Sequence, residues 1–145
     1  LAAARSDYHH RLVHYIEDNE TNVEVMRGML AQRPQVDLQV SGNGLDGLAA
    51  IRIRRPDVLL LDMHLPDISG LELLRHLKLD PETQGIPVIV VSANALPTQI
   101  DEALQAGAHR YLTKPVSVSE LLDAVDELLR VTDTRFGDIE PTTSH

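Results

Sequence analysis

Chemically useful side chains stand directly after short apolar segments at four places in this chain. They are Glu17 and Asp18 after segment 12–16, Asp62 after 58–61, Ser92 after 87–91, and Lys114 after 110–113. Carboxylates that crowd together raise one another's pKa unless a cation lies between them. Oxygen ligands favour a hard ion such as Mg²⁺, and a lysine with a hydroxyl can hold a phosphoryl group beside that ion. These residue types outline a phosphoryl-transfer site if one fold brings them together.

Strand and helix patterns alternate along the chain, which is what such a site requires. The continuous apolar segments 58–62 and 87–92 are typical of parallel strands buried on both faces, whereas 36–40 alternates as an edge strand does. The alternation predicts an α/β fold, namely a flavodoxin-like, doubly wound, five-stranded parallel sheet of order 2-1-3-4-5 with helices on both faces. The carboxyl ends of its strands lie along one edge, where we expect the residues named above.

Capping patterns and prolines delimit the helices between these strands. The predicted helices are 21–33, opened by Thr21-x-x-Glu24 and stopped by Pro34; one closed by Pro56; 69–79, opened by Ser69-x-x-Glu72; 97–107, with Pro97 at its first position; and 117–130, opened by Ser117-x-x-Glu120. In the helix before Pro56, we expect Leu45, Leu48 and Ala49 to form the buried face.

The first predicted helix carries two apolar stripes where a surface helix needs one. Val23, Met26 and Leu30 form the first stripe, and Val25 with Met29 forms the second. The second stripe either widens the contact with the core or provides a docking patch for a partner.

Composition limits the class of protein. The 145 residues are 43% hydrophobic and 24% charged, which is ordinary for one globular domain. The formal net charge of -9 argues against binding to nucleic acid or to an anionic membrane surface, and we expect no membrane contact by this domain. The absence of cysteine excludes disulfides and thiolate metal sites. We predict a linker or cloning remnant at 1–10, one domain at 11–130, and a polar C-terminal tail at 131–145.

Four segments in order resemble the receiver domains of two-component signalling. They are Tyr15-Ile16-Glu17-Asp18-Asn19, Leu60 to Gly70 around Asp62, Val90-Val91-Ser92-Ala93, and Tyr111-Leu112-Thr113-Lys114-Pro115. The resemblance covers roughly residues 11–130 and is closest to the receivers of hybrid sensor histidine kinases.

The resemblance implies a role for each acidic residue. Asp62 would take a phosphoryl group from a phosphohistidine, in a self-catalysed transfer followed by autodephosphorylation. Asp18 and Asp62 would bind Mg²⁺ directly, Glu17 would act through water, and the backbone carbonyl of His64 would complete the site. Mn²⁺ is expected to substitute for Mg²⁺.

The resemblance also implies roles for residues of the last two strands. Lys114 would neutralise the phosphoryl oxygens, and Ser92 would donate its hydroxyl to them. Tyr111 would rotate inward as Ser92 moves. The Lys114-Pro115 peptide bond would be cis, as is usual in receivers.

The expected partners and setting follow from the same resemblance. The partner would be a histidine kinase or a histidine phosphotransfer domain, and a homodimer would form through the last two helices and the last strand. We expect a cytoplasmic domain excised from a hybrid histidine kinase, and a single-domain response regulator is the alternative. The resemblance leaves open whether the parent protein is membrane-associated.

Three rival functions share parts of the pattern. A cobalamin-binding module uses Asp-x-His-x-x-Gly, but Asp67 occupies the glycine position after Asp62-x-His64. A haloacid-dehalogenase-type phosphatase needs a second Asp where His64 stands. A scaffold that binds partners without phosphorylation would not need the full set of acids, hydroxyl and lysine.

Two features depart from the usual pattern of the family. Ser92 replaces the threonine of many receivers. The side chains at the positions of His64 and Asn94 flank the path of a hydrolytic water in the family, so His64 and Asn94 bear on the lifetime of the phosphoryl group.

Overall fold

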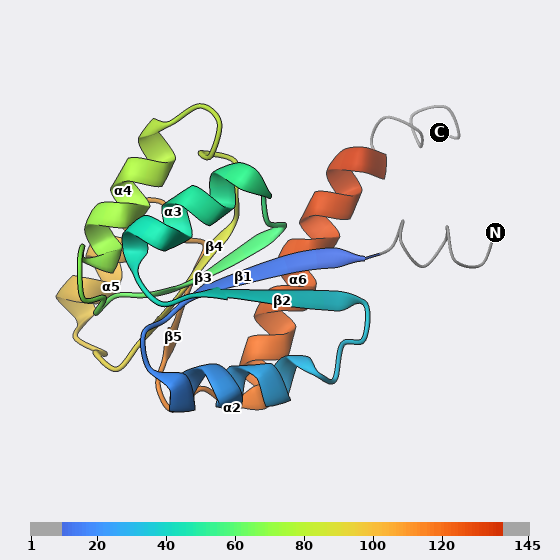
Figure 1. The fold of residues 1–145 in the computed structure, drawn as a ribbon, viewed down its shortest axis with the longest axis horizontal. Coiled ribbons are helices and arrows are strands. Elements are labelled where there is room, and N and C mark those ends of the chain that lie inside the picture. The colour runs from blue at the N-terminus through green and yellow to red at the C-terminus, as the bar shows by residue number, and fades with distance from the viewer. Residues whose placement is uncertain (1–9, 138–145) are drawn as a thin grey trace.

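Five parallel strands form one sheet in the order β2-β1-β3-β4-β5 (Figure 1). The computed structural model describes residues 10–137, with side chains described to residue 130. The strands are β1 (Arg11–Ile16), β2 (Val36–Ser41), β3 (Val58–Asp62), β4 (Val88–Ser92) and β5 (Arg110–Thr113). The helices are α2 (Glu20–Leu30), α3 (Gly44–Ile53), α4 (Gly70–Leu79), α5 (Pro97–Gln105) and α6 (Val118–Gly137). The predicted strand order is confirmed.

The sheet separates two aliphatic cores. Helices α2 and α6 cover one face, and α3, α4 and α5 cover the other (Figure 1). Every residue of β3 and β4 is buried, whereas edge strand β2 is mostly half-buried. This burial explains why β3 and β4 are continuously apolar in sequence and β2 is not. Between residues 10 and 137, no helix is both long and apolar enough to cross a membrane.

The strand register aligns the carboxyl ends of the strands. Ile16 pairs with Leu61, Asp62 pairs with Val91, and Ser92 pairs with Thr113. The residues that end or follow these strands therefore share one edge of the sheet, as the sequence predicted.

The predicted start of the first helix is wrong. Helix α2 begins at Glu20, and the side chain of Asn19 caps it by accepting a hydrogen bond from the backbone N–H of Asn22 at 2.9 Å. Asn is among the best N-cap residues and comes first along the chain, so Thr21 is already helical. The helix also ends at Leu30 rather than near Arg33.

Other predicted helix starts agree with the structure. The hydroxyl of Ser69 accepts from the N–H of Glu72, and that of Ser117 accepts from the N–H of Glu120. Pro97 occupies the first residue of α5. Side-chain caps of this kind satisfy backbone donors that a helix leaves free at its start.

The predicted buried face of α3 is right for Leu48, which is half-buried against the core, and wrong for Leu45 and Ala49. Leu45 is 61% exposed and Ala49 is also exposed, whereas Gly44, Gly47 and Ile51 are buried. A Cβ on Gly47 would overlap the side chain of Ile16, so the glycines bring the helix backbone close against the sheet. Close backbone approach, rather than leucine packing, sets the orientation of this helix.

Helix α6 continues beyond the predicted domain end. It runs to Gly137, into the segment 131–145 that we predicted as a polar tail. A two-pronged ion pair joins it to the segment that follows α2: Nε and Nη2 of Arg33 lie 3.0 and 2.7 Å from the two carboxylate oxygens of Asp126. The rest of the predicted tail and residues 1–9 lie outside the described residues, so these domain boundaries stay predictions.

The second apolar stripe of α2 does not form a continuous exposed patch. Met29 is 7% exposed and belongs to the core, while Val25 is 55% exposed. The stripe therefore widens the core contact through Met29 and leaves Val25 alone at the surface.

A histidine is buried in β1. The Nε2 atom of His14 lies 2.7 Å from the hydroxyl oxygen of Ser41 on the neighbouring strand. Burial lowers the pKa of His14, and the Gln39 side chain offsets only part of this shift. The folded state therefore disfavours a proton that the unfolded chain accepts below its ordinary pKa of 6.5.

The stability contributed by neutral His14 should be lost as the pH falls below 6.5. One proton changes the free energy of unfolding by at most about 1.4 kcal/mol per pH unit. We expect His14→Gln to reduce the loss of stability between pH 7.5 and 5.5, measured by urea unfolding. The control Thr98→Ala alters an exposed side chain without a titratable group and should leave the slope unchanged. Equal slopes for the parent and His14→Gln would contradict the prediction.

Candidate functional site

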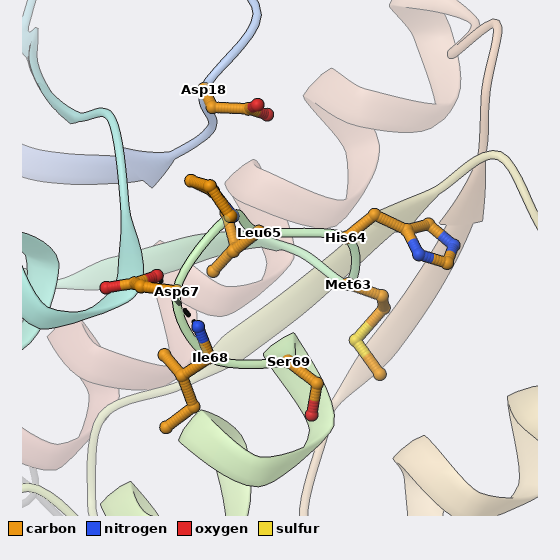
Figure 2. A pocket seen from close by; sticks show the side chains of 8 residues that line it. Asp18, Met63, His64, Leu65, Asp67, Ile68 and Ser69 are labelled. Carbon is orange, nitrogen blue, oxygen red and sulfur yellow. Dashed lines mark hydrogen bonds between the residues drawn. The ribbon is translucent and has the colours of Figure 1, made fainter.

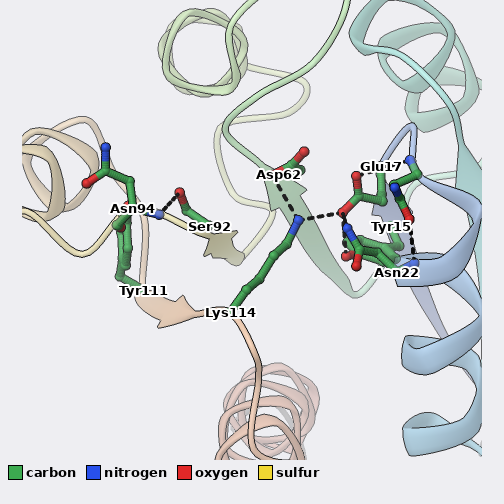
Figure 3. Close-up of polar contacts among 9 residues, drawn as sticks. Tyr15, Glu17, Asn22, Asp62, Ser92, Asn94, Tyr111 and Lys114 are labelled. Carbon is green, nitrogen blue, oxygen red and sulfur yellow. Dashed lines mark hydrogen bonds and ion pairs between the residues drawn. The ribbon is translucent and has the colours of Figure 1, made fainter.

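The ammonium group of Lys114 lies between two buried carboxylates at the carboxyl edge of the sheet (Figure 3). Its Nζ is 2.7 Å from Oε1 of Glu17 and 3.3 Å from Oδ1 of Asp62. The side chains of Glu17 and Asp62 are only 1% and 5% exposed. Residues that follow β1 and β5 and the last residue of β3 thus meet at one point.

Several donors hold Glu17 in place. Besides Lys114, the hydroxyl of Tyr15 donates to Oε1 at 3.0 Å, the side-chain amide of Asn22 donates to Oε1 at 3.2 Å, and the backbone N–H of Asn19 donates to Oε2 at 3.2 Å. Burial alone raises the pKa of the Glu17 carboxyl, but the hydrogen bonds and the charge of Lys114 lower it below its ordinary value.

Sequence analysis missed Tyr15 and Asn22 as supporting residues. Tyr15 stands two positions before Glu17, and alternate residues of an extended chain point to the same side. Asn22 lies in the first turn of α2, which starts directly after the acidic pair. The position of Tyr15 was thus a signal in the sequence, whereas the reach of Asn22 depends on where α2 begins.

Asp62 is destabilised as an anion. Burial and the nearby negative charge of Glu17 raise the pKa of Asp62, and Lys114 offsets only part of that shift. Burial lowers the pKa of Lys114, but its contacts with Glu17 and Asp62 raise it more, so this side chain stays an ammonium ion. Two carboxylates therefore share a single ammonium ion, and the edge of the sheet retains excess negative charge.

The acidic cluster fits a hard divalent cation. One carboxylate oxygen from each of Glu17, Asp18 and Asp62 lies within 4.8 Å of the others. Asp18 is exposed, so an ion could reach the cluster from solvent. All three donors are oxygens, which suits Mg²⁺ or Mn²⁺ rather than a soft metal.

A cavity of about 330 Å³ opens beside this cluster (Figure 2). It is lined by Asp18 and by residues 63–69 of the loop between β3 and α4, here named the β3–α4 loop. A second hollow of about 450 Å³ is lined by His64 and by residues 93–96 after β4. The ring of His64 points away from Asp18 in Figure 2, in keeping with a contribution through its backbone and not its ring.

The residues predicted as a conformational switch are joined through one peptide segment. Ser92 is buried, and its hydroxyl oxygen accepts a hydrogen bond from the backbone N–H of Asn94 at 3.1 Å. The half-buried Tyr111 donates its hydroxyl to the backbone carbonyl of Asn94 at 2.6 Å (Figure 3). The Lys114-Pro115 peptide bond is cis, in agreement with expectation.

Comparison with known families shows to which of the rival families the chain belongs. Residues 13–126 match the model of the response regulator receiver domain. The chain belongs to the response regulator receiver family. Members of this family bind a divalent metal ion and interact with histidine kinases or phosphotransfer proteins. The acidic cluster and its lysine therefore lie in a receiver domain.

Curated relatives and solved structures agree with the family. The polar-differentiation response regulator DivK of Brucella anthropi is 36% identical over 114 residues, which cover 79% of this chain and 92% of that protein. A putative response regulator from Chloroflexus aurantiacus has a TM-score of 0.79 at 26% identity, with 83% of this chain and 98% of that one covered.

A third relative bears on the metal. The receiver domain of the sensor histidine kinase PA1611 from Pseudomonas aeruginosa has a TM-score of 0.75 at 27% identity. The match covers 83% of this chain and 98% of that domain, which was solved with a magnesium ion coordinated in its active-site cleft.

The raised pKa of Asp62 predicts that its charge reduces stability when no divalent cation is bound. We expect Asp62→Asn to stabilise the fold in EDTA by about 1 kcal/mol, because it removes one of two repelling anions. Urea unfolding at pH 7.5 would measure the change.

Asp101→Asn is the control, since Asp101 is exposed on α5 and lies outside the acidic cluster. This variant should have the stability of the parent. A destabilised Asp62→Asn protein would show that the Asp62 charge supports the fold, against the prediction.

Proposed function

We propose that this chain is a phosphoacceptor domain of a two-component phosphorelay. Asp62 takes a phosphoryl group from a phosphohistidine on a histidine kinase or a histidine phosphotransfer domain. The position of the Lys114 ammonium, in contact with both Asp62 and Glu17, is the observation that supports this most directly. It places a cation beside the reacting carboxylate, where it can also neutralise phosphoryl oxygens.

The transfer requires little covalent chemistry from the protein. A carboxylate oxygen of Asp62 bonds to phosphorus as the phosphorus–nitrogen bond of the phosphohistidine breaks, and the electron pair of that bond stays on the imidazole. The contact with Lys114 orients Asp62 for this attack and balances charge on the phosphoryl oxygens. Glu17, Asp18 and Asp62 hold Mg²⁺, which supplies further positive charge to the phosphoryl oxygens when it is bound. The backbone carbonyl of His64 is proposed as an additional ligand, and Glu17 as a ligand through water.

The product alters the contacts of Ser92. A hydroxyl that donates to the phosphoryl group moves away from the N–H of Asn94, which it now accepts from. The carbonyl of Asn94 accepts the hydroxyl of Tyr111, so a shift of the Asn94 backbone would also disturb the hydrogen bond of Tyr111. Phosphorylation then shifts a two-state equilibrium that reshapes the surface of α5, β5 and α6. We propose this surface as the homodimer interface.

The setting of the domain is part of the proposal. Similar proteins include both a response regulator and the receiver domain of a sensor histidine kinase, so receivers similar to this chain are found in both kinds of protein. We propose a receiver from a hybrid histidine kinase that acts in the cytoplasm.

Intact mass spectrometry tests the function directly. After incubation with acetyl phosphate and Mg²⁺, we expect one added phosphoryl group on the parent and none on Asp62→Asn. Omission of Mg²⁺ should abolish the adduct. If Asp62→Asn is labelled like the parent, Asp62 is not the acceptor. If the parent shows neither an adduct nor a Mg²⁺-dependent beryllofluoride complex, the proposed function is wrong.

Lys114→Ala should separate metal binding from phosphoryl transfer. Loss of the ammonium leaves Glu17 and Asp62 more negative, so the affinity for Mg²⁺ measured by calorimetry should stay equal or increase. Labelling by acetyl phosphate should fall by about 100-fold, because a preorganised cation no longer faces the phosphoryl oxygens. Equal losses of Mg²⁺ binding and labelling would contradict the role given to Lys114. Arg110→Ala removes an exposed cation paired with Glu127 and should alter neither property.

A further inference from the structure

An exposed carboxylate of the β3–α4 loop is held by backbone groups of another element. Oδ1 of Asp67 accepts from the N–H of Gly44 at 2.8 Å and from its own neighbour Ile68 at 2.9 Å, and Oδ2 accepts from the N–H of Leu45 at 2.8 Å. Gly44 and Leu45 open α3, where backbone donors lack partners within the helix and favour negative charge. Asp67 thus fastens the loop to the start of α3 (Figure 2).

Steric fit reinforces this attachment. A Cβ on Gly44 would overlap Cγ2 of Ile68 and would lie 3.3 Å from Oδ1 of Asp67. The backbone at the start of α3 therefore lies directly against side chains of the β3–α4 loop. A single methyl group at position 44 would push the loop outward, because packed atoms have no free space to take up the overlap.

The segment 41–45, which leads into α3, also contacts Glu17 of the acidic cluster. The carbonyl oxygen of Ser41 accepts from the backbone N–H of Glu17 at 2.9 Å. Three residues after Ser41, the N–H of Gly44 reaches Asp67, so the segment 41–45 contacts both Glu17 and the β3–α4 loop. Asp67 closes a ring of contacts that runs from β1 through segment 41–45 to the loop after Asp62.

The far side of the loop is fixed independently. The N–H of Gly70 donates to the carbonyl of Met63 at 3.0 Å, and a Cβ on Gly70 would overlap the carbonyl oxygen of Asp62. The ends of the loop are thus tied to the end of β3 and the start of α4. Its middle, which carries His64 and lines the cavity beside Asp18, is held to segment 41–45 by Asp67.

We propose that Asp67 is a positioning residue for the metal site, since it sets the distance between the β3–α4 loop and the β1 carboxylates. The inference rests on the proposed function, because it assumes that Glu17, Asp18 and Asp62 hold Mg²⁺. Asp67 touches neither the ion nor the phosphoryl group. Groups that orient metal ligands typically change metal affinity about 10-fold to 100-fold when they are removed.

Calorimetric titration with Mg²⁺ compares the parent with two variants that loosen the same contact in different ways. Asp67→Ala removes all of the carboxylate contacts and should weaken Mg²⁺ binding about tenfold. Gly44→Ala keeps every charge but displaces the loop by steric overlap, and it should weaken binding in the same direction. Asp67→Asn keeps one acceptor oxygen and should lie between the parent and Asp67→Ala. Saturating Mg²⁺ should restore labelling by acetyl phosphate toward the parent rate in each variant.

Two controls separate positioning from charge and from stability. Asp46→Asn removes a negative charge from the same end of α3, and Ser117→Ala removes a comparable side-chain cap from α6, outside the β3–α4 loop; both should keep the parent affinity within about twofold. Weaker binding by Asp67→Asn and Asp46→Asn with no change in Gly44→Ala would show a charge effect and overturn the inference.

The remaining outcomes are also decisive. Weaker binding by Ser117→Ala, equal to that of Asp67→Ala at matched loss of stability, would show a general effect of destabilisation and overturn the inference. Failure of the parent itself to bind Mg²⁺ would refute the proposed function. Parent binding with unchanged Asp67→Ala and Gly44→Ala would refute this inference alone.

Discussion

The contact of one ammonium ion with two buried carboxylates is the constraint on which the site depends. Glu17 and Asp62 would repel each other in the same low-dielectric environment without Lys114. The lysine holds them close, yet one positive charge does not balance the exposed Asp18 as well. The edge of the sheet therefore keeps a negative charge that a divalent cation can neutralise. Stability and metal affinity are linked because they arise from the same unbalanced charges.

The architecture supplies this arrangement without any direct contribution from the core. Strands β3 and β4 are buried along their whole length, so aliphatic packing fixes their register and their ends. Parallel strands bring those ends to one edge, where polar contacts such as those of Glu17 and Asp62 replace aliphatic packing. The residues that pack the core and the residues of the site thus follow one another along the same strands. Asp62 is the exception, because it is both the last residue of β3 and part of the site.

The sequence predicted the strands and the residues at their ends well, because long apolar segments and the polar residue that stops them are local signals. Contacts between elements were harder to predict. The exposed Leu45 and the buried Gly47 reverse the usual hydrophobic pattern, since close approach to Ile16 requires a residue without a side chain. The start of α2 was missed because Asn19 and Thr21 are both good caps and only the packed helix selects between them. The hydrogen bonds between Asp67 and the start of α3 depend on the path of a loop, which the hydrophobic periodicity of a sequence does not predict.

The two hydrogen bonds of the Asn94 backbone have a thermodynamic consequence. Its N–H is satisfied by Ser92 at the end of β4 and its carbonyl by Tyr111 on the neighbouring strand β5. A partly buried N–H that loses its acceptor is costly, so the turn of the Ser92 hydroxyl that we propose would favour a different position of the loop. The displaced loop then takes the acceptor of Tyr111 with it. In the proposed switch, the side chain of Tyr111 on β5 would thus respond to a phosphoryl group that it never touches, through the hydrogen bonds of the Asn94 backbone.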